Sequence, residues 1–207
     1  MAVRRSMQML CRRITMLARF AVVLSFALVA LRGLAAETSP ALVLSPKALG
    51  PLALGKGATV SEQRLKRLFP AYTVKYDIGQ GDSPDFHYFE VVDSKGEVLF
   101  TIQSFIEQGE SKKTTSEVPI QLLQIHTRHI KDIYGLRVGD RVKDIIEKRG
   151  QALAFGASHH DVYLGGGEIF YNIANASDLS PEGLTREDAV KGNWQVRSIS
   201  WPGSAWD

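Results

Sequence analysis

Seven runs of β-prone residues, separated by glycine, proline or polar turns, dominate the chain from residue 71 onwards. The runs cover residues 71–78, 86–93, 97–105, 118–127, 160–164, 168–173 and 194–201. They are rich in Val, Ile, Tyr and Phe, and several alternate apolar with polar positions, as strands with one buried face do. Short connections such as Ser94-Lys95-Gly96 are typical of antiparallel hairpins. We therefore expect a mainly antiparallel sheet.

Three segments before or between these runs predict short helices. Ser61 is a suitable N-cap for a helix that Pro70 ends. Apolar positions within 140–149 share one helical face. Thr185 and Asp188 have the spacing of a capping box. The predicted fold class is α+β, with two or three short helices beside the sheet.

The chain also repeats its own plan. In the stretch Tyr134 to Ala152, glycines at 135 and 139 lead from a β-prone run into a helix, and the earlier turn 55–59 does the same. Each turn and helix is followed by antiparallel strands. We predict two similar halves with a boundary near 128–134, inside a single domain over 50–207. Residues 37–49, with two prolines, are an extended lead-in.

The first 36 residues predict an export signal. They contain six arginines and no acidic residue, and a largely apolar run of 12 residues lies between the last two arginines. A basic start, a short apolar core and small residues form a secretory signal, whereas a spanning helix needs about 20 apolar residues. We expect cleavage after Ala35 or Ala36. An uncleaved anchor remains an alternative, as does a start at Met7 or Met16 in place of Met1.

Removing the signal reverses the charge. Without its six arginines, 19 of the 25 Lys and Arg remain against 22 Asp and Glu, a formal charge of −3. No basic stripe then survives to bind a phosphate backbone, so we do not expect nucleic acid as a partner. Cys11, the only cysteine, precedes the apolar run and is not placed as a lipidated cysteine would be. The expected product is a periplasmic protein without lipid, thiol or disulfide.

The glycine turn before the second predicted helix can be compared with known phosphate-binding motifs. Gly135 and Gly139 supply neither the three glycines of a dinucleotide fingerprint nor the Gly-Lys-Ser/Thr of a P-loop. Asp140 would also place a negative charge at the helix start, which repels phosphate. The interpretation is an architectural joint, and the Gly55-Lys-Gly57 turn resembles a P-loop only superficially.

Four histidines are the candidate metal ligands: His126, His129, His159 and His160. His126 and His129 are three residues apart, a spacing that brings side chains together on a helix but not at the strand end expected there. The second pair begins a strand, where neighbouring side chains point to opposite faces. A catalytic zinc needs three protein ligands. We therefore assign no metal, cofactor or catalytic residue, and convergence of the two pairs is left open.

Other polar and aromatic residues give weaker signals. The carboxylates Glu90, Asp93, Glu168 and Asp178 are scattered along the chain. The run 165–167 (Gly-Gly-Gly) predicts a tight loop, with a flap over a ligand as the alternative. Of the tryptophans at 194, 201 and 206, one of the first two is expected in the core and another as an exposed contact.

The segment SPEGLTREDAVKGNWQVRSISW, residues 180–201, carries a family resemblance at Pro181, Glu182, Gly183, Leu184, Asp188, Asn193, Trp194, Val196, Ile199 and Trp201. It resembles the end of the sigma-E-regulated (RpoE-regulated) lipoproteins of Gram-negative envelopes, and the likeness spans roughly 44–201. That family has no established activity, and the resemblance implies an envelope protein facing the periplasm and linked to envelope stress. The chain has Ala35-Ala36-Glu37 where the family carries its lipidated cysteine.

These observations favour a non-enzymatic periplasmic protein that binds another envelope component. The alternative is a small-ligand or metal-binding module that uses a groove between the two halves. An unrecognised hydrolase is a third hypothesis, although the sequence has no Gly-x-Ser-x-Gly motif.

Overall fold

The computed structural model describes residues 42–80, 84–107, 116–150, 153–157, 162–174 and 184–202. Its main feature is an eight-stranded sheet of order β11-β12-β13-β14-β9-β7-β6-β5, in which every neighbouring pair is antiparallel. Three short helices accompany the strands in the described ranges. The predicted α+β fold, mainly antiparallel, is confirmed.

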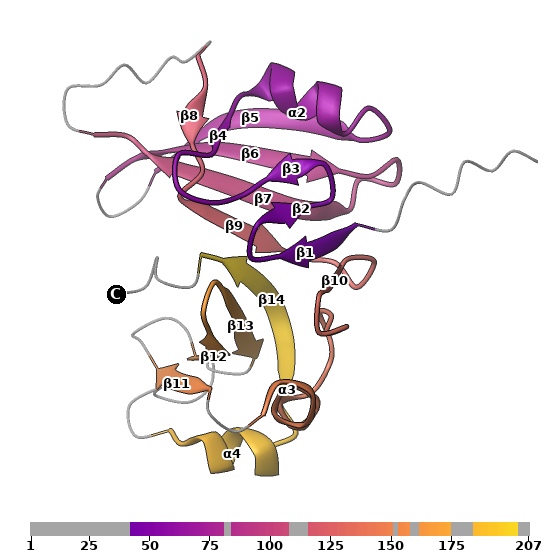
Figure 1. Cartoon of the computed structure of the whole chain (residues 1–207), viewed down its shortest axis with the longest axis vertical. Coiled ribbons are helices and arrows are strands. Elements are labelled where there is room, and N and C mark those ends of the chain that lie inside the picture. Colours follow the sequence, from indigo (N-terminus) through magenta and orange to yellow (C-terminus); the bar gives the residue numbers. More distant parts are fainter. Residues whose placement is uncertain are drawn as a thin grey trace, which may run out of the picture. The chain divides into compact units, whose positions relative to one another are not determined.

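The large sheet consists of two four-stranded meanders joined at their last strands. The first contains β5 (Thr73–Gly79), β6 (Phe86–Val92), β7 (Val98–Phe105) and β9 (Leu122–Ile125). The second contains β11 (Ala154–Ala157), β12 (Val162–Gly166), β13 (Ile169–Ala174) and β14 (Gln195–Trp201). Figure 1 shows β14 beside β9, and their register sets Ile199 opposite Ile125 and Trp201 opposite Leu123. Each half therefore contributes one four-stranded antiparallel meander to the sheet.

Two smaller sheets belong to the first half. One has the order β10 (Lys131–Asp132), β1 (Val43–Ser45), β2 (Ala48–Leu49) and β3 (Leu52–Ala53). The other pairs β4 (Thr59–Val60) with β8 (Val118–Pro119). The described part of the expected lead-in thus forms β1 and β2. Because β10 lies in the predicted boundary and pairs parallel to β1, the boundary segment returns to the first half.

Two of the three helices, the first and the last, begin at the caps that the sequence predicted. Ser61 Oγ accepts a hydrogen bond from Arg64 N at the start of α2 (Glu62–Leu68). α3 spans Val142–Arg149 and α4 spans Arg186–Lys191. At α4, Thr185 Oγ1 accepts from Asp188 N at 3.2 Å and Asp188 Oδ2 accepts from Thr185 N at 3.0 Å. The predicted capping box is confirmed.

Strand alternation divides the sheet into a covered and a polar face. In the first meander the covered face carries Phe89, Phe100, Ile102, Leu123 and Ile125, each no more than 1% exposed. α2 packs on this side, where the rings of Phe69 and Phe100 lie 5.2 Å apart. The opposite face carries polar side chains such as Glu90, Thr101 and Gln124, because side chains alternate between faces along a strand.

Two predicted elements differ from the structure. The run 118–127 was expected as one strand but is divided into β8 and β9, because the segment between them turns: Ile120 N donates to Ala58 O and Gln121 N to Gln103 O. The run 165–167 was expected as a loop, yet Gly165 and Gly166 belong to β12. Only Gly167, with φ +64°, and Glu168 form the turn.

Several predictions fall outside the described residues: the signal at 1–36, His159, His160, Asp178 and Trp206. Within the described ranges, no helix combines the length and apolar character needed to cross a membrane.

Candidate functional site

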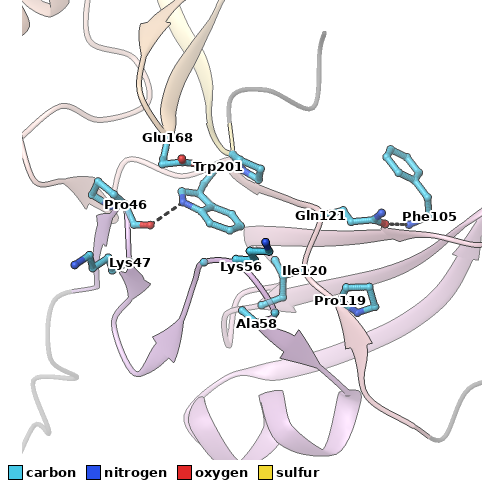
Figure 2. Close-up of a pocket in the computed structure, with 13 residues that line it drawn as sticks. Pro46, Lys47, Lys56, Ala58, Phe105, Pro119, Ile120, Gln121, Glu168 and Trp201 are labelled. Carbon is cyan, nitrogen blue, oxygen red and sulfur yellow. Dashed lines mark hydrogen bonds between the residues drawn. The ribbon is translucent and has the colours of Figure 1, made fainter.

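A cavity of about 680 Å³ lies where the end of β14 meets the small strands of the first half (Figure 2). We call it the seam cavity. Its walls come from the β1–β2 turn, the β3–β4 turn, the end of β7, the segment around β8, the β12–β13 turn and the end of β14. The lining residues are Pro46, Lys47, Gly55, Lys56, Gly57, Ala58, Phe105, Pro119, Ile120, Gln121, Glu168, Trp201 and Pro202.

Trp201 connects the two halves at this cavity. Its side chain is 4% exposed, and its Nε1 donates a hydrogen bond to Pro46 O over 2.9 Å. Its backbone lies in the β14–β9 ladder opposite Leu123. An indole held at both its ring nitrogen and its backbone is a rigid apolar wall. This residue is the core tryptophan that the sequence predicted, whereas Trp194 is partly buried.

Three charged side chains line the seam cavity without an ion pair to any described residue: Lys47, Lys56 and Glu168. All three are exposed to solvent. The lysines belong to turns of the first half, and Glu168 belongs to the β12–β13 turn of the second half. In Figure 2, Trp201 lies between Glu168 and Lys56. The cavity is therefore lined by two lysines from one half and one glutamate from the other.

The turn that carries Lys56 depends on glycine. Gly55 has φ +132° and Gly57 has φ +78°, values that side chains with a Cβ rarely adopt. Ala58 N donates to Gly55 O at 3.0 Å, which closes the turn. The amide N–H groups of Lys56 and Gly57 donate to no described residue. The turn leaves both amides and the lysine ammonium group available to an acceptor.

The remaining wall of the cavity is mostly apolar. Ala58, Pro119 and Ile120 lie together in Figure 2, and Phe105 is 37% exposed at the rim. Gln121 Oε1 accepts a hydrogen bond from Phe105 N, which orients the amide group. The side-chain NH₂ of Gln121 remains as a donor.

The structure separates three of the four carboxylates that the sequence left scattered, and Asp178 lies outside the described residues. Asp93 Oδ1 accepts from Lys95 N and Glu97 N at 2.8 and 2.9 Å, so it closes the β6–β7 turn. Glu90 lies 3.8 Å from Lys75 on the polar face. Of the three described carboxylates, only Glu168 lines the seam cavity. Glu168 is a single acidic residue after a run of glycines, and no pattern in the sequence distinguished it from the other carboxylates.

The described histidines do not form a metal site. His126 Nε2 lies 3.0 Å from Thr101 Oγ1, and His129 Nε2 lies 3.9 Å from Glu97 Oε2. Although His126 remains partly exposed, burial of the rest of its ring lowers the pKa of the imidazole, while the charge of Glu90 opposes that shift. No group of three or more candidate metal ligands gathers among the residues that the structure describes.

Sequence reasoning missed one buried histidine. His87 is 3% exposed, and its Nδ1 lies 2.9 Å from Tyr76 Oη. Ser104 lies opposite His87 in the β6–β7 register, with a buried hydroxyl that has no partner among the described residues. The alternation of β6, which places His87 on the same face as Phe89, was the available signal. This group lies in the interior and outside the seam cavity.

A second buried polar group surrounds Asp132, which is 1% exposed. Its Oδ1 accepts from Tyr134 N and Leu136 N, and its Oδ2 accepts from Tyr171 Oη. Arg149, at the end of α3, donates to Gly166 O at 2.7 Å and to Ile169 O at 2.9 Å. The guanidinium also lies over the rings of Tyr134 and Tyr171. These contacts tie α3 and the second meander to β10.

The glycine turn before α3 is an architectural joint. Gly135 and Gly139 have φ +75° and +86°. Asp140 Oδ2 accepts from Arg137 N at 3.0 Å, while its Oδ1 lies 3.4 Å from Arg128. Gly139 N donates to Val196 O, so the joint is bonded to the start of β14. The Asp140 carboxylate is thus used inside the turn.

A solved structure has a similar fold. The structure is similar to that of the uncharacterised protein YfeY from Escherichia coli, with a TM-score of 0.54 and 19% sequence identity. The match covers 77% of this chain and 99% of that chain. At this identity the similarity shows a shared fold alone. No protein-family model and no curated protein matches the chain. Membership of the sigma-E-regulated lipoprotein family therefore stays a prediction.

Proposed function

We propose that the protein is a non-enzymatic binding protein of the bacterial cell envelope, and that the seam cavity is its binding site. The observation that carries this proposal is the seam cavity itself, with a fixed indole and unpaired charges of both signs. Its volume of about 680 Å³ falls in the range of about 300–1,000 Å³ typical of ligand pockets. An apolar wall with a few polar groups is the usual composition of such sites.

Placement in the envelope is supported by the N-terminal segment and the C-terminal motif. Five arginines followed by an apolar run and small residues have the parts of an export signal. The motif at 181–201 resembles the sigma-E-regulated lipoproteins, and a role in envelope maintenance or stress follows from that resemblance. We propose a periplasmic protein without a lipid anchor, because Cys11 precedes the apolar run.

The same cavity also accommodates the alternative, a small-ligand module, because both occupants would use the same apolar wall and charged rim. The two occupants can be distinguished by crosslinking. A segment of a partner protein would give a covalent adduct with that protein, whereas a free small molecule would not.

Photo-crosslinking in intact cells tests the proposal. A benzophenone-bearing phenylalanine at Phe105, on the rim of the cavity, is expected to give a reproducible adduct with one envelope protein. The matched control places the same residue at Ile133, which is 50% exposed and does not line the cavity. Equal adducts at both positions, or none at Phe105, would argue against the cavity as a partner site.

Fractionation tests the location separately. Osmotic shock should release the protein with the soluble periplasmic fraction. Retention in membranes after a high-salt wash would contradict the absence of an anchor, and retention in the cytoplasm would contradict export.

A further inference from the structure

We propose that the seam cavity binds the free carboxyl end of an extended peptide segment. The inference rests on the proposed binding function and adds the chemistry of the occupant. It follows from the distribution of charge, apolar surface and unused hydrogen-bonding groups around the cavity.

The first half of the cavity is suited to a carboxylate. Lys47 and Lys56 both line it and form no ion pair with a described residue. The amides of Lys56 and Gly57 belong to the same turn and donate to no described residue. Lysine ammonium groups together with free backbone N–H groups are the donors that capture a terminal carboxylate in peptide-binding proteins.

The apolar wall is suited to the side chain nearest that carboxylate. Trp201 and Ile120 are buried and fixed, and Pro119 lies beside Ile120 in Figure 2. A rigid indole with neighbouring prolines provides flat apolar surface at low entropic cost, as grooves for extended peptides do. We therefore expect an apolar residue at the peptide terminus or immediately before it.

Glu168 supplies the opposite polarity on the second half. Its exposed carboxylate has no ion pair within the described chain. A peptide offers N–H donors and cationic side chains a few atoms away from its carboxyl end, and the NH₂ group of Gln121 can meet a peptide carbonyl. The tail of a single-chain lipid has neither kind of group. The mixed charge therefore favours a peptide over a lipid tail.

The test uses two matched pools of N-acetylated hexapeptides with apolar residues in the last two positions. One pool has a free carboxyl end, and the other has a carboxamide of nearly the same shape. Protein purified from cells that express the full-length chain is immobilised without a C-terminal tag, and bound peptides are quantified by mass spectrometry. We expect free acids to be enriched at least about ten-fold over the amides, because a charge-assisted hydrogen bond contributes about that factor or more.

The control variants assign that preference to the cavity. Lys56→Glu should abolish the preference for the acid, whereas Lys95→Glu, an exposed lysine in the β6–β7 turn, should retain it. Circular dichroism establishes that each variant is folded, and Lys56→Gln should give an intermediate preference.

The outcomes separate the two proposals. The carboxyl-end inference is overturned if the acid and amide pools are captured equally, or if the preference for the acid survives Lys56→Glu. In either case, a crosslink at Phe105 would still support the cavity as a binding site. If the wild-type protein captures neither pool while dodecanoate binds in a Lys56-dependent manner, the occupant is a lipid and the peptide inference is wrong. Absence of both the crosslink and any peptide capture overturns both proposals.

Discussion

Tyr171 donates its phenolic hydrogen to Asp132 Oδ2 over 2.5 Å, and this bond joins β13 of the second meander to β10, which pairs with β1 of the first half. Burial, together with the charge of Asp132, raises the pKa of the Tyr171 hydroxyl, so it acts as a donor throughout the physiological range. A connection between the halves thus depends on one buried polar pair.

Removing the Tyr171 hydroxyl should weaken that connection. Tyr171→Phe leaves the buried carboxylate with only its backbone donors, and a buried group that loses a partner typically costs about 1–3 kcal/mol. Urea denaturation measures the difference. Tyr163→Phe is the matched control, because Tyr163 is half-buried and its hydroxyl has no hydrogen bond to a described residue. If both variants lose the same free energy of unfolding, the hydrogen bond to Asp132 does not contribute to stability as expected.

Ile125 is expected to be among the most sensitive core positions. It is fully buried and lies between Phe100 on β7 and Ile199 on β14, at the junction of the meanders. Ile125→Ala should lower the free energy of unfolding by about 2–5 kcal/mol, the usual cost of such a cavity. Ile133→Ala, at a side chain that is 50% exposed, should cost less than about 1 kcal/mol.

The same junction predicts cooperative unfolding. Because both meanders share one sheet, fluorescence and circular dichroism should report a single coincident transition for the wild-type protein. Two separated transitions would show that the halves unfold independently.

Two adjacent glycines provide a test of close backbone packing. A Cβ at Gly165 would lie 2.7 Å from Ile169 O and from Phe170 Cα, whereas a Cβ at Gly166 meets only Leu153 Cδ2 at 3.5 Å. Gly165→Ala should therefore destabilise the protein by about 1–3 kcal/mol, the cost of overpacking. Gly166→Ala should be nearly neutral. Thermal denaturation of the two variants measures the contrast, and the reverse order would contradict the register of β12 and β13.

The capping box of α4 should make stability depend on acidic pH. Hydrogen bonds from Thr185 lower the pKa of the Asp188 carboxyl below its ordinary value of 3.8. As the pH falls, the unfolded chain therefore binds this proton first, and the stabilisation present above about pH 4 is lost as the pH falls through the folded pKa. The urea midpoints of wild type and Asp188→Ala should differ at pH 6 and approach each other at pH 3. A constant difference would contradict this linkage.

Local patterns in the sequence predicted the elements well. Alternation in 86–93 and 97–105 indicated β6 and β7, and the pair Thr185 and Asp188 indicated the start of α4. The joining of β9 to β14 could not be predicted, because it depends on a pairing between distant segments whose edges carry no distinguishing residues. Pro119 lies at the end of the short β8, where the expected single strand is interrupted.

The seam cavity was less accessible to prediction than the fold. Its charged rim combines Lys56 in one glycine turn with Glu168 in another, and only the β9–β14 pairing brings these turns near each other. One of Trp194 and Trp201 was expected in the core, but the hydrogen bond of Trp201 to Pro46 could not be predicted without the position of the β1–β2 turn. The predicted groove between the halves had no residues assigned to it until the sheet order was known.

β14 is the central partner of both meanders, yet it is the final strand among the described elements. During synthesis, the first meander leaves the ribosome long before residues 195–201 are made. The edge of β9 has no β14 to pair with until then. The large sheet can therefore close only after nearly the whole described chain has emerged. Until then, β9 has an unpaired edge that can pair with a strand of another chain.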